Sequence, residues 1–174
     1  MLPAIQTPYE PEVRYMERAL ELAELAAAEG EVPVGAVVVH KPTGAIIGEG
    51  YNRREAAKSP LSHAEILAIR QASRTLGGWR LLQSAIYVTL EPCPMCAGAM
   101  INSRIRRCYY GAPDPKAGAA GTLVDLLSDQ RFNHQVEVVA GLKQAEAAGL
   151  LQNFFRGIRA KRKAAKKARQ EGSA

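Results

Sequence analysis

Cysteine is scarce in this sequence, and its distribution argues against a secreted protein held together by disulfides. The 174 residues include three cysteines, Cys93, Cys96 and Cys108, and an odd number is a poor basis for a disulfide framework. In a reducing compartment, a close pair such as Cys93 and Cys96 more often binds a metal or takes part in redox chemistry.

Long apolar segments are also missing. No run in the sequence is long enough to span a bilayer. Residues 1–8 are broken by prolines and lack the basic start and apolar stretch of an ordinary secretory signal. We therefore expect a soluble, cytoplasmic protein that does not associate with a membrane.

The composition is that of a folded chain. A hydrophobic fraction of 47% argues against disorder, and the length gives room for one compact domain with a core. The sequence shows no internal repeat and no linker between domains. We expect one domain over residues 1–156 and a basic helical tail over residues 157–174.

The positive charge is concentrated near the C-terminus. The formal net charge is +6, and eight of the 23 Lys and Arg residues lie between Arg156 and Arg169, where there is no Asp or Glu. The rest of the chain has 15 basic and 17 acidic residues and so carries a formal charge of −2. Such a run is either the solvated face of a helix or a contact surface for a polyanion such as a nucleic acid, and the charge alone leaves both open.

Apolar periodicity and turn residues predict alternating helices and strands. In chain order we expect a helix over 12–29, a hairpin of strands 34–39 and 45–48, a helix over 62–76, a strand over 84–90, a helix from 91 to about 103, a strand over 105–110, a short helix around 123–127, a strand over 135–140 and a long helix from 142 into the basic tail. This alternation predicts a layered α/β domain. The hairpin at its start predicts a sheet of mixed strand direction.

Two motifs contain the residues best suited to metal binding or catalysis, His63-Ala64-Glu65 and Pro92-Cys93-Pro94-Met95-Cys96. Each falls at the first turn of a predicted helix. Cys93 and Cys96 are three residues apart, so on a helix they share one face and can chelate one ion. The positive end of a helix also favours the thiolate that a metal needs. His63 adds a neutral nitrogen and completes a set of three ligands.

Three protein ligands are typical of catalytic zinc. Structural zinc is normally closed by four Cys or His side chains, whereas catalytic zinc keeps one position for water. Water bound to such an ion loses a proton near pH ~7 instead of pH ~16. Cys108 is conceivable as a fourth ligand, but it lies in a predicted strand, and we interpret it as a small core residue. The sequence thus predicts one Zn²⁺ held by His63, Cys93 and Cys96.

Glu65, two residues after His63, is the candidate acid–base residue. A carboxylate at this position can take a proton from the zinc-bound water and deliver it to a ring nitrogen and to the departing amine. The order His-x-Glu followed by Pro-Cys-x-x-Cys is the signature of zinc enzymes that deaminate nucleobases. We therefore expect Glu65 to move protons while an exocyclic amine is removed from a nucleobase.

Each motif alone has another interpretation. The cysteine pair could be a thioredoxin-type redox pair or half of a structural zinc site. His63 could be an ordinary surface or core histidine. Ser62 and Glu65 could form a capping box, in which the glutamate only satisfies a backbone N–H. The two motifs together are rarely met by chance, so their combination favours catalytic zinc.

Beyond these motifs, the chain closely resembles the bacterial tRNA-specific adenosine deaminases of the cytidine deaminase-like superfamily. The likeness covers most of residues 12–156 and is carried by the stretches 31–37, 48–53, 63–66, 90–93, 96–101, 103–105, 111–116, 118–121 and 154–156. It implies a three-layer α/β/α fold with a mixed, mostly parallel central sheet flanked by helices. It also implies that residues 1–156 form a zinc-dependent deaminase domain.

The resemblance further implies a reaction and its partners. The reaction would be the hydrolytic conversion of adenosine to inosine at the wobble position of the anticodon of an arginine tRNA, with one Zn²⁺ per subunit. The enzyme would be a homodimer that holds each anticodon loop with surfaces from both subunits.

Six residues match positions that contact the substrate in that family: Val32, Asn52, Ala64, Leu90, Asp114 and Phe154. Asn52 matches the residue that hydrogen-bonds the target nucleotide, and the backbone beside the ligand histidine could read the base edge. Val32 and Leu90 match pocket walls, and Asp114 and Phe154 match positions that meet neighbouring nucleotides. Val32, Leu90 and Phe154 are equally consistent with ordinary packing, and Asn52 with a turn at a strand end.

Two other functions remain open at this point. One is deamination of a free base or nucleoside, such as guanine or cytosine, because the metal motif does not separate these substrates. The other is a non-catalytic RNA-binding module with structural zinc. The loop over 111–121, the Phe154-Phe155 pair and the basic tail favour an RNA substrate, since RNA recognition commonly targets unpaired loops whose bases can enter pockets.

Overall fold

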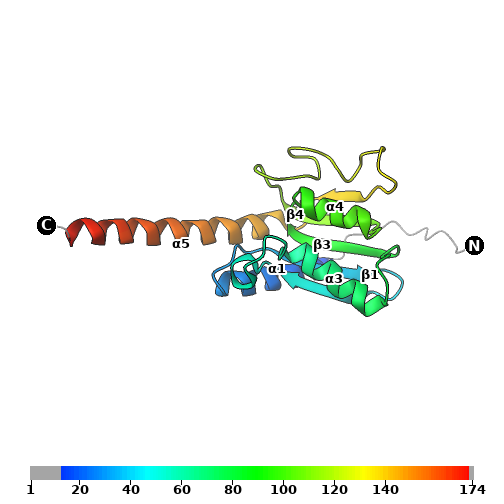
Figure 1. Ribbon diagram of the computed structural model, residues 1–174, viewed down its shortest axis with the longest axis horizontal. Coiled ribbons are helices and arrows are strands. Elements are labelled where there is room, and N and C mark those ends of the chain that lie inside the picture. The colour runs from blue at the N-terminus through cyan, green and yellow to red at the C-terminus, as the bar shows by residue number, and fades with distance from the viewer. Residues whose placement is uncertain (1–12, 173–174) are drawn as a thin grey trace, which may run out of the picture.

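A five-stranded sheet forms the centre of the computed structural model, which describes residues 13–172 (Figure 1). The strands are β1 (Gly35–His40), β2 (Ala45–Tyr51), β3 (Ser84–Leu90), β4 (Arg107–Ala112) and β5 (Glu137–Ala140). Their order across the sheet is β2-β1-β3-β4-β5. Strand β1 is antiparallel to both of its neighbours, while β3, β4 and β5 are parallel, so four of the five strands run in one direction.

Helices cover both faces of this sheet. Helices α1 (Val13–Ala28) and α5 (Gln144–Glu171) pack on one face, and α3 (Ala64–Leu76) and α4 (Pro94–Asn102) lie on the other (Figure 1). A fifth, single-turn helix, α2 (Arg54–Ala57), follows β2. The predicted three-layer α/β/α fold with a mixed sheet is therefore confirmed.

The central strands β1 and β3 contribute to two hydrophobic cores, one on each face of the sheet. Successive side chains of a strand point to opposite faces, so Val37, Val39 and Tyr87 pack with α1, whereas Val38 and Ile86 pack with α3 and α4. Strands buried on both faces are apolar at nearly every position. This explains why β1 and β3 read in the sequence as continuous apolar runs.

Glycines in β2 bring α3 close to the sheet. A Cβ atom on Gly48 would lie 2.1 Å from the carbonyl oxygen of Ala68, and one on Gly50 would lie 2.3 Å from that of Ala64. No side chain fits at such separations, so helix and strand touch through their backbones. This contact fixes the position of His63, which precedes α3.

The strand directions bring the two sequence motifs to one edge of the sheet. Strand β1 is antiparallel to both β2 and β3, so β2, β3 and β4 all end at the same edge. The chain leaves β2 toward His63, and it leaves β3 directly into Pro92 and Cys93. The loop after β4 starts at this edge too. Ligand sites in open α/β sheets commonly lie beyond the carboxyl ends of the strands.

Most predicted elements are confirmed within one to three residues at their ends. The predicted start of the first helix at Glu12 and the proline-rich residues 1–8 lie outside the described residues, as do residues 173–174 of the basic tail. None of the helices within 13–172 combines the length and the apolar composition needed to cross a membrane.

One local prediction was wrong, and one helix was missed. The segment 123–127 is not a helix but an irregular strand-like turn, in which Ala120 forms an isolated bridge with Asp125 and Leu126 N–H donates to the Ala119 carbonyl. Leu127 is buried there in the core. Helix α2 was not predicted, because it depends on a distant residue. The buried carboxylate of Glu31 accepts hydrogen bonds from the backbone N–H groups of Glu55 and Ala56.

Candidate metal centre

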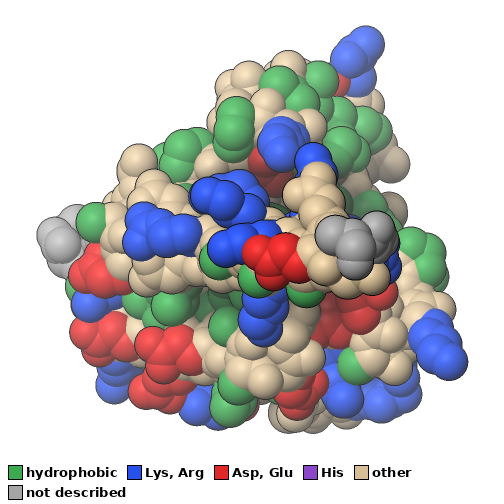
Figure 2. All heavy atoms as spheres, turned by 90° about the vertical axis from the view of Figure 1, so that its left-hand side faces the viewer, with side chains coloured by type: hydrophobic (Ala, Val, Ile, Leu, Met, Phe, Trp, Pro, Cys, Tyr) green, Lys and Arg blue, Asp and Glu red, His purple; other side chains and the backbone are tan. Residues whose placement is uncertain are grey.

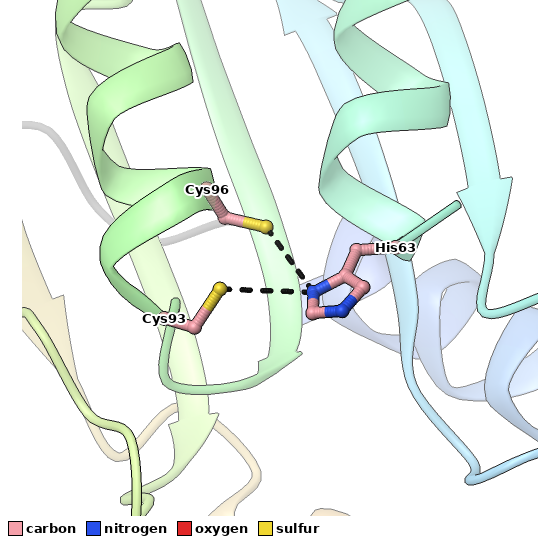
Figure 3. Close-up of side chains that lie close together, drawn as sticks. All are labelled: His63, Cys93 and Cys96. Carbon is pink, nitrogen blue, oxygen red and sulfur yellow. Dashed lines mark hydrogen bonds between the residues drawn. The ribbon is translucent and has the colours of Figure 1, made fainter. Parts of the chain in front are cut away.

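The first metal-site residue of each motif is the N-cap of a helix at this edge. His63 is the N-cap of α3 and Cys93 that of α4, and both have extended backbone dihedral angles. Neither side chain makes a capping hydrogen bond. Instead, both point into the space between the two helix starts, where Cys96 joins them from the first turn of α4 (Figure 3).

The three ligand atoms have the separations that a tetrahedral zinc ion requires. Nδ1 of His63 lies 3.7 Å from Sγ of Cys93 and 3.6 Å from Sγ of Cys96, and all three atoms lie within 4.8 Å of one another. With Zn–S bonds of about 2.3 Å and Zn–N bonds of about 2.0–2.1 Å, a tetrahedral ion separates its N and S ligands by roughly 3.6 Å. The donor set and its spacing therefore fit one Zn²⁺.

Cys108 lies apart from this group. It is in β4, fully buried in the core on the α3 and α4 side of the sheet. Burial raises the pKa of its thiol, which keeps it protonated and unreactive. The structure thus agrees with the interpretation of Cys108 as a core residue.

The two site cysteines share a hydrogen bond that couples the loss of their protons. Cys96 donates a hydrogen bond to Cys93, and this bond, supported by His63, lowers the pKa of the Cys93 thiol. The same bond, together with burial, raises the pKa of Cys96. Metal ligation requires thiolates, so the pair must give up its shared proton when the metal binds.

Glu65 is buried next to the metal-site residues. Its side chain is 4% exposed, faces the same cleft as His63 and hydrogen-bonds with the Cys96 thiol. Burial is the main cause that raises the pKa of Glu65 to about 7. A carboxyl group with such a pKa can both accept and donate protons near neutral pH. The capping-box alternative does not hold, because the N-cap is His63 and no side-chain capping bond is present.

A cleft of about 540 Å³ opens over this centre. Five of the six predicted substrate-contact residues line it: Val32, Asn52, Ala64, Leu90 and Asp114. The sixth, Phe154, lies beside the cleft, where its ring meets that of Phe155 edge to face with centroids 5.5 Å apart. Leu151 and Phe155 are the α5 residues that line the cleft.

Asn52 has a structural role as well as a place in the cleft. Its amide nitrogen donates to the Val32 carbonyl and its amide oxygen accepts from the backbone N–H of Arg54. The side chain therefore connects the segment before β1 with the start of α2. The turn role considered from the sequence is present, and it also holds Asn52 at the cleft wall.

Sequence reasoning missed Glu91, which organises the loop after β4. Its side chain is 1% exposed, and its carboxylate accepts hydrogen bonds from the backbone N–H groups of Asp114, Ala120 and Thr122 and from the Thr122 hydroxyl. A Cβ atom on Gly118 would lie 2.4 Å from this carboxylate, so the loop needs glycine there. An acidic residue directly after a fully buried, mostly apolar strand is the available signal, since a buried carboxylate must find donors.

The sequence reasoning also missed two cations in the cleft. Arg54 of α2 and Lys116 of the loop after β4 line the cleft beside Asp114. Both are exposed, so they are available to a ligand at the mouth of the cleft. Their charge favours an anionic group such as a phosphate.

Comparison with known proteins agrees with this geometry. Residues 10–112 match the model of the cytidine and deoxycytidylate deaminase zinc-binding region. The chain is 50% identical over 153 residues to the tRNA-specific adenosine deaminase of Bacillus subtilis, covering 88% of this chain and 94% of that protein. It is 45% identical over 150 residues to the enzyme of the same name from Haemophilus influenzae, covering 86% of each.

Solved structures give the same result. A structure from a study of A-to-I editing by tRNA:A34 deaminases at the wobble position of transfer RNA matches with a TM-score of 0.77 and 44% identity, over 80% of this chain and 100% of that chain. A guanine deaminase from Bacillus subtilis matches less extensively, with a TM-score of 0.58 and 38% identity over 65% of this chain and 71% of that chain.

Replacing Cys93 tests the metal assignment. We expect Cys93→Ala to lose bound zinc, because the remaining His63 and Cys96 offer too few ligands. Elemental analysis of the purified, dialysed protein measures the zinc content per chain. The control is Cys108→Ala, which removes a core thiol and is expected to keep one zinc per chain. Full zinc occupancy in Cys93→Ala would refute the assignment.

Replacing Glu91 tests its role in the loop over residues 113–122. We expect Glu91→Gln to cost about 1–3 kcal/mol of stability, because an amide nitrogen would face backbone donors that need an acceptor. Amide hydrogen exchange should accelerate in this loop while zinc content stays unchanged. Glu24→Gln on the exposed face of α1 removes the same charge and should leave the exchange of the loop unchanged. Equal protection in both variants would contradict this role.

Proposed function

Because the chain belongs to the family of deaminases that share the cytidine and deoxycytidylate deaminase zinc-binding region, we propose that it hydrolyses adenosine to inosine in tRNA. One observation carries the proposal most directly. Three metal ligands and a buried carboxylate of raised pKa converge in a cleft large enough for a nucleotide. The relatives of 45–50% identity, which carry the name of tRNA-specific adenosine deaminases, supply the substrate class.

Zinc held by His63, Cys93 and Cys96 would supply the Lewis acid that activates water near neutral pH. Glu65 moves the protons. It takes up the two protons of the attacking water in turn and passes the first to the ring nitrogen and the second to the exocyclic amine of adenine. The C–N bond then breaks, and the amine leaves as ammonia while the water oxygen remains on the ring carbon. The pKa of Glu65 near neutrality suits both directions of transfer.

The walls of the cleft orient the base. We assign the sides of the base pocket to Val32 and Leu90, and the contact with the base edge to the backbone of Ala64. Asn52 contacts the target nucleotide from a position that its own hydrogen bonds hold fixed. A base can reach the metal centre only when it is unpaired, which agrees with an anticodon loop as the substrate.

An RNA substrate explains more of this molecule than a free base does. Arg54 and Lys116 place positive charge at the cleft, and a free base carries no phosphate to bind there. Asp114 and the Phe154-Phe155 pair lie at or beside the same cleft and are suited to neighbouring nucleotides. The domain over residues 1–156 would then carry the chemistry and the tail over 157–174 would assist binding.

We propose three finer features on the basis of the resemblance to tRNA adenosine deaminases. The edited position is the wobble adenosine of an arginine tRNA. The enzyme works in the cytoplasm and as a homodimer. Exposed apolar side chains near the loop after β4 support a second subunit, because Leu123 is 57% exposed and Val124 is 47% exposed, and such side chains are typical of association surfaces when they cluster.

Replacing Glu65 tests the chemical mechanism. We expect Glu65→Gln and Glu65→Ala to keep zinc and to bind tRNA normally. The rate of inosine formation should fall ~10²- to 10⁴-fold, the usual contribution of acid–base catalysis. Single-turnover assays with excess enzyme report the chemical step. A non-catalytic RNA-binding module with structural zinc would have no inosine formation to lose. Near-normal turnover in either variant would contradict the role of Glu65.

The choice of substrate separates RNA editing from free-base deamination. We expect the zinc-loaded protein to form inosine in an anticodon stem-loop and to leave free adenosine, guanine and cytosine unchanged. Mass analysis of nuclease digests detects the product. The same incubation with a chelator should stop the reaction. Turnover of a free base or nucleoside, with none of the stem-loop, would favour the alternative deaminase instead.

A further inference from the structure

Helix α5 begins on the body of the protein and ends in solvent. It extends from Gln144 to Glu171 without interruption, and its second half projects away from the sheet (Figure 1). Ala147 is buried against the body, whereas every residue from 159 to 172 is exposed. Figure 2, turned so that the projecting end of α5 faces the viewer, shows Lys and Arg side chains gathered across the middle of this face.

The helical register aligns part of this positive charge with the cleft. An α-helix turns by about 100° per residue. Leu151 and Phe155 line the cleft, and continuing outward by steps of three or four residues from Phe155 reaches Arg159, Arg162 and Lys166. These three cations lie within about 40° of Phe155 around the helix axis. We call Arg159, Arg162 and Lys166 the basic row.

Three other cations of this segment do not share that direction. Lys161, Lys163 and Lys167 lie about 80° to 120° away from Phe155 around the same axis. Arg169, three residues beyond Lys166, lies within about 40° of Phe155 and so continues the direction of the row. Lys167 pairs with Glu171 on that other side of the helix. Between residues 147 and 170 the sequence has no acidic residue, so no negative charge of α5 interrupts the row. Residues 159–167 therefore carry two sets of three cations that differ mainly in the direction they face.

The row starts at an exposed aromatic ring. Phe155 lines the cleft and is also 42% exposed to solvent. An RNA base outside the cleft can therefore stack on its ring. Proteins that bind single-stranded nucleic acid combine aromatic rings, on which bases stack, with a positive surface that follows the phosphates. Phe155 followed by the basic row has this arrangement, and it extends about 17 Å from Phe155 to Lys166.

We propose that the basic row binds the phosphates of the RNA strand next to the reacting nucleotide, so that the tRNA leaves the cleft along α5. This inference rests on the proposed function and adds to it the direction in which the RNA continues. The row is uniformly cationic and, beyond Phe155, contains no apolar side chain. Its chemistry therefore fits a polyanion rather than an apolar protein surface.

Two variants with the same net charge test the row. The row variant is Arg159→Gln, Arg162→Gln and Lys166→Gln, and the control variant is Lys161→Gln, Lys163→Gln and Lys167→Gln. Glutamine is a good helix former, so both variants should keep α5 helical, which circular dichroism verifies. Binding of a full-length tRNA transcript is measured over a range of salt concentrations, and inosine formation is measured at saturating tRNA.

We expect the row variant to bind the transcript at least ~10-fold more weakly at physiological salt, and its log K against log[salt] slope to become shallower by about two, because fewer counterions are released. Its turnover at saturating tRNA should match that of the parent, since the row does not touch the reacting base. The control variant should lose much less affinity. An oligonucleotide confined to the anticodon loop, too short to reach Lys166, should lose less affinity for the row variant than the full-length transcript does.

Three results would overturn the inference. Equal losses in both variants would mean that α5 acts through its overall charge and not through the row. Unchanged binding in the row variant would remove the row from the interface. Unchanged binding together with a loss of dimer in light scattering would assign the row to a second copy of the chain. If the parent binds tRNA but forms no inosine, the proposed function fails, while the binding comparison still tests the row.

Discussion

The metal centre depends on holding atoms from two separate helix starts within one coordination sphere. His63 and the cysteines are 30 or more residues apart in the sequence, yet their ligand atoms lie within 4.8 Å of one another. The arrangement has two structural causes. Strands β2 and β3 end at the same edge of the sheet, and Gly48 and Gly50 let the backbone of α3 contact that of β2.

Glu65 and Glu91 are both buried at this edge of the sheet, but their surroundings give them different roles. Burial alone raises the pKa of a carboxyl group, and hydrogen bonds to the carboxylate lower it. Burial dominates at Glu65, whose pKa rises to about 7. Burial also raises the pKa of Glu91, but its hydrogen bonds from Thr122, Asp114 and Ala120 together outweigh this, and the pKa falls below its usual value. Glu65 is thus suited to carry protons, and Glu91 remains a fixed anchor for the loop.

The residues that line the cleft come from two parts of the chain. The metal ligands and Glu65 come from two short motifs, and the family match over residues 10–112 contains both of them. The loop after β4 and helix α5 lie beyond that match, yet Asp114, Leu151 and Phe155 complete the cleft. An RNA substrate accounts for the cationic mouth and the projecting basic helix together.

The sequence by itself determined the ligand set, the candidate proton carrier and nearly all the helices and strands, because helix starts, turn residues and apolar periodicity are local properties. It did not reveal α2, which depends on the distant Glu31. Its apolar pattern also predicted a helix over 123–127, where packing of Leu127 and a backbone hydrogen bond to Ala119 hold the chain in an irregular conformation instead. The choice of Phe155 rather than Phe154 as the cleft residue likewise depends on how α5 is rotated on the sheet. Only the tertiary structure decides such features, since hydrogen bonds and packing between remote segments leave no periodic trace in the chain.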